Sequence, residues 1–342
     1  MGQLIDELCK NFNKKYKGEL VHRGVGEYNY KRIPFTSLRL NYVTFGGIPM
    51  GKLIEFCGEE HGGKTTTALD VVANYQRMET GKDVLYADCE NTLDTEWAKK
   101  LGVKVDDIIL LKPTSQGAED LFDFILSMMD TGELGLVVID SLGVMLSNQA
   151  MEKTVAEKTY GGIAMALTNF SKRAEGICQR NGCTVIGINQ MRDDLNSPYG
   201  GTTTTGGRAW KHNCIARFEF RKGKYIDNSG NELSSRAENP AGNKIHVSMI
   251  KNKSCPPTRR LGFYTLRYDI GVDYLSDMVD VAIYYDIIRK NGAWFDIVDV
   301  DTGDVIYTKI HGKPALLELL ASEAALSEKI STKINTLIQS EC

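Results

Sequence analysis

The sequence has no long apolar run, since none of its segments approaches the roughly 18 consecutive apolar residues that mark a membrane-spanning helix. Residues 1–8 also lack a basic stretch followed by an apolar one, so we expect no secretory signal peptide. The eight cysteines are scattered and form no Cys-x-x-Cys pair, which argues against a zinc site or a redox dithiol. We therefore expect a protein of the reducing cytoplasm that makes no contact with membranes.

A strong excess of either charge is absent as well. The chain has 342 residues, with 41 Lys and Arg against 44 Asp and Glu, and its net charge is −3. This balance excludes a globally basic nucleic-acid binder, so any contact with a polyanion would be local and carried by loops. The sequence also has no internal repeat and no low-complexity segment, and its length allows one large domain or two to three smaller ones.

One glycine-rich stretch organises the chain. Residues 58–65 have the pattern G-x-x-x-x-G-K-T of a phosphate-binding loop, between a strand predicted over 52–57 and a helix predicted over 65–79. Glycines let the backbone approach an anion, and the N–H groups at the start of the helix point toward it. The residues predicted to bind the nucleotide are Gly58, Glu59, Glu60, His61, Gly62, Gly63, Lys64, Thr65 and Thr66.

Strand-like and helical patterns alternate after this loop. Strands are predicted at 52–57, 83–89, 107–112, 134–140, 183–189 and 216–221, with further strands at 244–252 and 261–269. Helices are predicted at 65–79, 93–101, 116–131 and 160–181. Near-continuous apolar strands separated by helices are typical of a mostly parallel sheet in a doubly wound α/β domain.

The two ends of the chain have different patterns. Residues 1–17 predict an amphipathic helix, which packs either on its own domain or on a neighbouring subunit, and Leu20 and Val21 predict a short strand. Beyond residue 272 we expect a helix over 277–290, a pair of strands around 294–300 and 304–307, and helices over 313–321 and 322–339. We divide the chain into an N-terminal helix and linker (1–45), a core (46–270) and a small C-terminal α/β domain (271–342).

Polar residues end several of the predicted core strands. Asp140 follows an apolar strand and would lie near Thr65, where the two side chains could hold Mg²⁺. Glu90 follows another strand and is a candidate base for the water that attacks a γ-phosphate, with Asp88 and Asp94 as competitors. Gln190 ends a third strand and could sense whether the γ-phosphate is present.

A long segment rich in glycine and threonine, residues 190–207, follows Gln190. Loops of this length are usually functional or disordered, and its hydroxyl and N–H groups suit a phosphodiester backbone. Leu195 and Tyr199 could wedge between bases or stack on them, whereas Asp193 and Asp194 repel phosphate. Lys251 and Lys253 end a later strand, where they are either ordinary surface charges or cations that reach a phosphate in a neighbouring subunit.

Taken in order, these motifs resemble the RecA family of recombinases over most of the chain. The matching stretches are 48–55 leading into 58–65, 88–94, 137–141, 188–192, 203–207 with Ala209 and Lys211, 250–253 and 292–295. The resemblance implies a RecA-like ATPase core, ATP and Mg²⁺ as cofactors, and helical filaments on single-stranded DNA that pair with homologous duplex DNA.

The resemblance also assigns roles to individual residues. Glu90 would be the base, Gln190 would couple the γ-phosphate to the DNA loop that follows it, and Lys251 and Lys253 would bind ATP across the filament interface. Lys64 already follows from the glycine-loop pattern, which puts its positive charge near the β- and γ-phosphates. Asp94 and Trp97 would contact the adenosine, Trp97 by stacking. Residues 147–162 and 191–207 would form two DNA-binding loops, and the N-terminal helix would dock on the next protomer. The DNA-binding candidates are Met191, Arg192, Leu195, Tyr199, Gly200, Thr204, Thr205, Gly206, Gly207, Arg208 and Lys172.

Four departures from the family pattern lead us to expect a divergent, phage-encoded member. His61 and Gly62 replace two serines, His212 replaces an interface phenylalanine, Asp193 and Asp194 replace a Met-Lys-like pair, and no acidic tail ends the sequence. Two alternatives to a recombinase remain at this point. They are a hexameric helicase motor with the same core and a non-catalytic ATP-binding scaffold whose DNA binding Asp193 and Asp194 have weakened.

Overall fold

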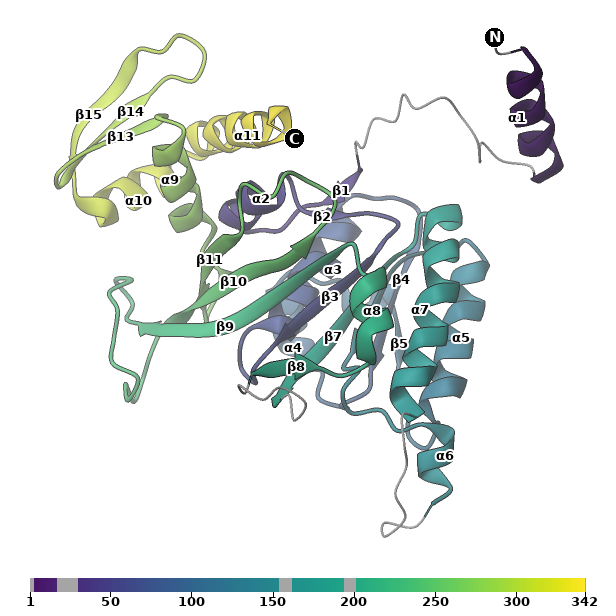
Figure 1. The fold of residues 1–342 in the computed structure, drawn as a ribbon. Coiled ribbons are helices and arrows are strands. Elements are labelled where there is room, and N and C mark those ends of the chain that lie inside the picture. Colours follow the sequence, from purple (N-terminus) through teal and green to yellow (C-terminus); the bar gives the residue numbers. More distant parts are fainter. Residues whose placement is uncertain (1–2, 17–29, 154–161, 194–200, 342) are drawn as a thin grey trace. The chain divides into compact units, whose positions relative to one another are not determined.

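A ten-stranded mixed sheet organises residues 31–342 (Figure 1). The computed structural model describes residues 3–16, 30–153, 162–193 and 201–341, and its contacts divide the chain into two units, residues 1–30 and 31–342. The strand order is β12-β11-β10-β9-β3-β7-β6-β4-β5, and β8 pairs with β7. The strands are β3 Leu53–Gly58, β4 Asp83–Asp88, β5 Ile108–Leu111, β6 Leu134–Asp140, β7 Thr184–Asp193, β8 Thr202–Thr204, β9 Ala216–Ile226, β10 Gly242–Asn252, β11 Leu261–Arg267 and β12 Gly271–Val272.

The pairs from β9 through β3, β7, β6 and β4 to β5 are all parallel, whereas β10, β11 and β12 extend the sheet in antiparallel pairs. The predicted α/β fold with a mostly parallel sheet is therefore confirmed, and every predicted core strand forms. A two-stranded ribbon of β1 Arg32–Ile33 and β2 Ile48–Pro49 precedes the sheet.

Side-chain alternation along the strands builds a separate apolar core on each face of the sheet. In β6, Leu136 and Val138 belong to one core, whereas Val137 and Ile139 belong to the other. The first face is covered by α3 Lys64–Arg77 and α4 Thr95–Lys100, and the second by α5 Ala118–Asp130, α7 Gly162–Asn181 and α8 Gly207–Asn213. In Figure 1, α5 and α7 lie side by side and α8 lies next to α7.

The first unit contains α1 Gln3–Tyr16, and the second also contains α2 Leu38–Thr44, the short α6 Asn148–Met151 and the 3₁₀ turn Val105–Asp107. In α1, which forms its own unit, Leu4, Ile5 and Leu8 are exposed, so the apolar stripe predicted for residues 1–17 is present. The strand predicted at Leu20 and Val21 lies outside the described residues.

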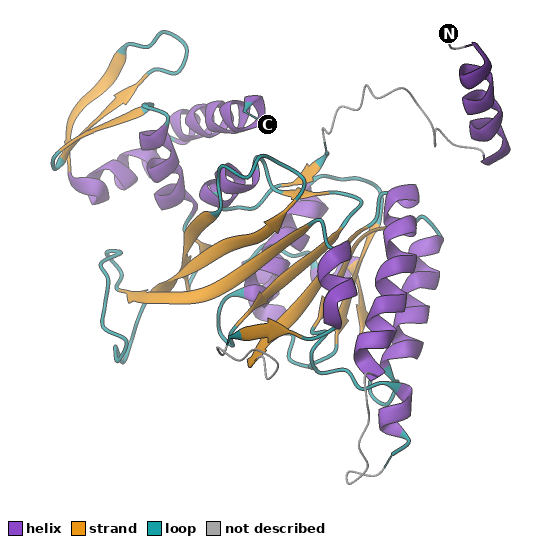
Figure 2. Cartoon of the chain, viewed as in Figure 1, coloured by secondary structure: helices purple, strands orange, loops and turns teal. Residues whose placement is uncertain are grey.

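The C-terminal residues form a third apolar core beside a small antiparallel sheet, β13 Ile288–Asn291, β14 Trp294–Val298 and β15 Val305–His311 (Figure 2). Its helices are α9 Tyr274–Tyr284, α10 Gly312–Ser322 and α11 Ala324–Ser340. The helix predicted over 277–290 was too long. Asp286 adopts a left-handed φ of 56°, which ends the helix, and Ile288 already begins a third strand. The domain boundaries at 45 and 270 stay a prediction.

The expectation of a plain loop over 190–207 was also wrong in part. β7 continues past Gln190 to Asp193, because Met191, Arg192 and Asp193 pair with the threonines of β8. Threonine favours strands, and α8 then begins directly at Gly207. Residues 194–200, at the middle of the segment, lie outside the described part of the chain.

Candidate functional site

The glycine loop closes tightly over the end of β3. Gly58 has a φ of 151°, and a Cβ there would lie 2.1 Å from the carbonyl oxygen of Phe220. Gly63 has a φ of 91° and is the N-cap residue just before α3, and no side chain caps the first turn of this helix. The backbone N–H groups at the start of this 14-residue helix are therefore available to an anion, which is the arrangement that a phosphate needs.

Lys64 lies inside the loop rather than in solvent. Its Nζ donates hydrogen bonds to the carbonyl oxygens of Gly58 (3.1 Å) and Glu59 (2.6 Å), and the residue is only 8% exposed. Burial lowers the pKa of Lys64, whereas the charges of Asp140 and Glu90 act in the opposite direction. The loop therefore holds an ammonium group at the place where phosphate oxygens would enter.

Asp140 and Thr65 meet as the sequence predicts. The Thr65 hydroxyl donates to Asp140 Oδ2 at 2.8 Å, and the Tyr86 hydroxyl donates to the same oxygen at 2.8 Å. Burial raises the pKa of Asp140, while these two hydrogen bonds lower it. Mg²⁺ prefers oxygen ligands and usually binds through one or two carboxylates together with phosphates, so this hydroxyl–carboxylate pair fits it. Tyr86 lies inside an apolar strand, and nothing in its sequence context marks it as part of the site.

Glu90 lies between two neighbours at the same edge of the sheet. Its Oε1 accepts hydrogen bonds from the Ser141 hydroxyl at 2.5 Å and from Gln190 Nε2 at 3.1 Å. The strand register explains why these residues meet, since Gly58 pairs with Gln190 and Asp88 pairs with Asp140. The structure therefore joins a carboxylate beside the phosphate loop to the strand that leads into residues 191–207.

The two competing carboxylates have structural roles. Asp88 is 2% exposed and accepts hydrogen bonds from the backbone N–H groups of Thr92 and Leu93, both at 3.1 Å. Asp94 caps α4 by accepting from the N–H groups of Glu96 and Trp97. Glu90 is thus the carboxylate of the three that faces the other polar residues of this edge.

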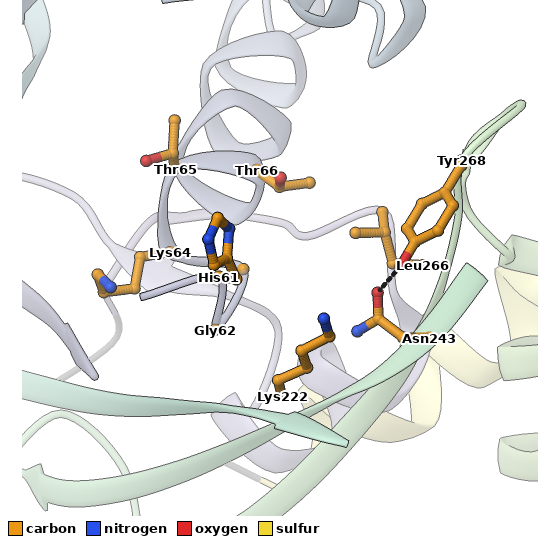
Figure 3. A pocket seen from close by; sticks show the side chains of 10 residues that line it. His61, Gly62, Lys64, Thr65, Thr66, Lys222, Asn243, Leu266 and Tyr268 are labelled. Carbon is orange, nitrogen blue, oxygen red and sulfur yellow. Dashed lines mark hydrogen bonds between the residues drawn. The ribbon is translucent and has the colours of Figure 1, made fainter. Parts of the chain in front are cut away.

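A pocket of about 340 Å³ opens beside the loop (Figure 3). Residues 61–66 line one side, and Lys222, Asn243, Leu266 and Tyr268 line the other. The Tyr268 hydroxyl donates to Asn243 Oδ1 at 2.9 Å, which fixes the phenol ring at the edge of the pocket. These residues come from the antiparallel end of the sheet, far away in sequence, and no motif marked them. On the helical side, Trp97 Nε1 donates to Thr66 Oγ1 at 3.4 Å, so the predicted adenosine-stacking residue adjoins the loop.

The described DNA-binding candidates lie on β7, on β8, at the start of α8 and on α7. Arg192 donates to the carbonyl of Gly143 at 3.0 Å, Thr204 is buried, and Gly206 has a left-handed φ of 98° at the start of α8. Arg208 is exposed on α8, and Lys172 is exposed on α7. Leu195, Tyr199 and Gly200 lie outside the described residues, as do Asp194 and residues 154–161 of the first predicted DNA loop.

Lys251 is engaged within its own chain. Its Nζ donates to the carbonyl oxygens of Lys211 (2.8 Å) and His212 (2.6 Å) at the C-terminal end of α8. Burial lowers its pKa, and the nearby charge of Lys253 acts in the same direction. The predicted role of Lys251 across a subunit interface stays a prediction.

Comparison with known proteins points to the same family as the sequence motifs do. The family model described as RecA N-terminal domain matches residues 3–273. The chain is 30% identical to Protein RecA of Gloeobacter violaceus over 340 residues, which cover 98% of this chain and 86% of that protein. It is 31% identical to Protein RecA of Thermus thermophilus over 334 residues, covering 96% and 93%. These relatives come from cellular organisms and give no support to a phage origin.

Proposed function

The chain belongs to the RecA family, and on this premise we propose that it is an ATP-dependent DNA recombinase. It assembles as a helical filament on single-stranded DNA in the cytoplasm, pairs that strand with homologous duplex DNA, and exchanges strands in recombination and repair. It hydrolyses ATP to ADP and phosphate. The observation that carries this proposal is the hydrogen bond from Gln190 to Glu90, because it connects the phosphate site to the strand that enters the second predicted DNA loop.

The phosphate loop and its neighbours bind the nucleotide. The N–H groups at the start of α3 and the Lys64 ammonium hold the phosphates, while Thr65 and Asp140 hold Mg²⁺. When bound, Mg²⁺ withdraws charge from the phosphate oxygens and so makes the γ-phosphate easier to attack. Asp94 and Trp97 contact the adenosine. The pocket side of the loop adds Tyr268, Asn243 and Lys222 as further candidates, since an aromatic ring and a cation suit a nucleotide.

Glu90 positions and deprotonates the attacking water. Its carboxylate lies beside the loop at the carboxyl end of the sheet, and Ser141 and Gln190 fix its orientation. Gln190 can exchange its hydrogen bond to Glu90 for one to the γ-phosphate. Such an exchange would report the state of the nucleotide to residues 191–207, and in the reverse direction it would free Glu90 when DNA binds.

The remaining predicted roles complete the filament. Lys251 and Lys253 bind ATP held by the neighbouring protomer, and the exposed apolar stripe of α1 docks on an adjacent protomer. The described DNA-contacting residues are Met191, Arg192, Thr204, Thr205, Gly206, Gly207, Arg208 and Lys172.

The decisive experiment measures ATP hydrolysis with and without single-stranded DNA, together with filament imaging and a strand-exchange assay. A recombinase shows strong stimulation by DNA, long filaments and transfer of a strand from a homologous duplex. Closed rings that unwind duplex DNA would instead indicate the helicase motor. ATP binding without DNA stimulation would overturn the proposal and favour a scaffold.

A further inference from the structure

Glu55 is a fully buried carboxylate in the strand that leads into the phosphate loop. The residue is 0% exposed and lies three positions before Gly58 in β3. Its Oε1 accepts hydrogen bonds from Asn189 Nδ2 at 2.9 Å and from the indole Nε1 of Trp210 at 3.0 Å, and its Oε2 pairs with Arg217. A buried charge is tolerated only when such partners satisfy it, so all three donors are needed.

The donors to Glu55 hold the segment that follows β7. Asn189 Nδ2 also donates to the carbonyl oxygen of Thr205 at 2.8 Å, and the Arg217 guanidinium also donates to Thr204 Oγ1 at 3.3 Å. Trp210 is the central buried residue of α8. One carboxylate therefore connects β3 to β8, to the turn at Thr205 and to α8.

The packing leaves this connection little freedom to adjust. Gly187 pairs with Glu55 in the parallel register of β7, and a Cβ at Gly187 would lie 2.5 Å from the Trp210 ring. The indole therefore sits directly on the backbone of the neighbouring strand. A displacement of α8 must break the hydrogen bond from Trp210 to Glu55 or move β3. A displacement of β8 must break the hydrogen bonds of Thr204 and Thr205 to Arg217 and Asn189, or move these two partners of Glu55, because close-packed interiors do not deform smoothly.

We propose that Glu55 is a positioning residue that couples the β8–α8 segment to the phosphate loop, so that DNA bound at the former changes the geometry of the latter. The proposal rests on the proposed function, since it assumes that residues 191–207 bind DNA. It adds a second connection through the interior of the sheet to the one formed by Glu90 and Gln190 at its edge. Glu55 touches no nucleotide and acts only through the residues that it holds.

The test compares Glu55→Gln with Asp277→Asn. Both variants replace a fully buried carboxylate by an amide of the same shape, but Asp277 lies in α9 and contacts Ser37, away from the phosphate loop. The glutamine amide has to turn a donor either toward Arg217, which holds Thr204, or toward Asn189 and Trp210, which hold Thr205 and α8. In Glu55→Gln, a thymidine oligonucleotide should stimulate ATP hydrolysis about tenfold less than it does in the unmodified chain. Half-maximal stimulation of the variant should also need more DNA. The KM for ATP without DNA should change less than twofold, and Asp277→Asn should be stimulated like the unmodified chain.

Trp210→Phe provides a second, milder test that does not depend on the folding of Glu55→Gln. It removes one donor and keeps an aromatic ring, so it should lose part of the stimulation, and the double variant should lose no more than Glu55→Gln alone. Unchanged stimulation in both single variants, with an unmodified chain that responds to DNA, would overturn the role of Glu55. If the unmodified chain itself fails to respond, the proposed function is wrong, and the inference is lost with it.

Discussion

Lys251 donates a hydrogen bond of 2.6 Å to the backbone carbonyl of His212, and so holds the C-terminal end of α8 in its own chain. The same helix begins at Gly207, at the end of the second predicted DNA loop. A cation at a helix C-terminus stabilises the helix, because it interacts favourably with the negative end of the helix dipole. If Lys251 also binds a nucleotide in the next protomer, the phosphate competes with these carbonyls for the N–H groups of the ammonium.

Lys251→Ala should impair only the assembled protein. If the ammonium acts on the neighbour's nucleotide, turnover in filaments should fall by on the order of 10³, the lower end of the range for a cation supplied in trans. Nucleotide binding by the dispersed protomer should remain.

A mixing experiment makes this prediction sharper. Lys64→Ala lacks the cation that holds the phosphates but keeps Lys251, whereas Lys251→Ala keeps Lys64. In a filament that contains both variants, some interfaces therefore combine an intact Lys64 from one protomer with an intact Lys251 from its neighbour. Activity should reappear in the mixture, although each variant alone is inactive. Lys251→Ala filaments that hydrolyse ATP at the unmodified rate would rule out the assignment in trans.

Glu90→Gln should separate binding from chemistry. The amide keeps the size of the side chain and can remain beside Ser141 and Gln190, but it cannot accept the proton of the attacking water. We expect ATP binding to persist while hydrolysis slows by about 10²–10⁴-fold, the usual contribution of a general base. Equilibrium nucleotide binding and single-turnover hydrolysis, measured on the same preparation, would check both.

Asp88→Asn is the matched control for Glu90→Gln. The Asp88 carboxylate accepts two backbone N–H groups, and an amide keeps only one acceptor oxygen, so the loss should appear in stability, at about 1–3 kcal/mol. Its turnover should fall far less than that of Glu90→Gln. The reverse ranking of the two rates would transfer the role of base to Asp88.

The sequence predicts most of this architecture because local patterns determine it. The apolar strands, the glycine loop and the strand-end polar residues Asp140, Glu90 and Gln190 depend on contacts along one strand or between strands whose carboxyl ends share an edge. Parallel strands with covered faces leave few other arrangements, so Thr65 and Asp140 could be expected to meet.

The parts that sequence reasoning missed depend on non-local packing. Tyr268 joins the pocket because antiparallel strands extend the sheet beyond β9, and Lys222 joins it from β9 itself, far from the loop in sequence. The sequence neighbours of these two residues do not mark them. In the sequence, Glu55 is only one polar residue within an apolar strand. Its role becomes visible in the structure, where Arg217 and Trp210 contact its carboxylate. The strand β8 escaped prediction because a threonine-rich run between glycines also suits a loop.

Asp277 should make stability depend on pH near neutrality. Burial raises the pKa of this carboxyl from 3.8 to about 7, although its hydrogen bond with Ser37 and the charge of Arg39 lower it, while Asp280 and Asp273 raise it further. The folded chain therefore binds a proton that the unfolded chain has already released. The contribution of this protonated carboxyl to the free energy of unfolding is fully present below about pH 4, the ordinary pKa range of an aspartate. This contribution is lost as the pH rises through 7.

Asp277→Asn removes this titration. The free energy of unfolding of the unmodified chain, relative to that of the variant, should fall between pH 4 and 8 by up to about 4 kcal/mol, which is the upper limit for a shift of three units. Urea unfolding of both proteins at several pH values measures the difference directly. Parallel curves for the two proteins would show that the Asp277 carboxyl does not titrate in this range.

DNA binding should weaken with salt, and Arg208 should account for part of that dependence. Arg208 is exposed in the first turn of α8, at the end of the segment predicted to bind DNA. Each phosphate contact on a single strand contributes about 0.7 to the slope of log K against log salt, because binding releases condensed cations. Arg208→Ala should therefore reduce the slope by about 0.7 and weaken binding to all sequences alike. Arg180→Ala removes an exposed arginine from the last turn of α7, where it pairs with Asp130, and should leave the slope unchanged. Equal slopes for the unmodified chain and Arg208→Ala would mean that Arg208 does not touch the DNA backbone.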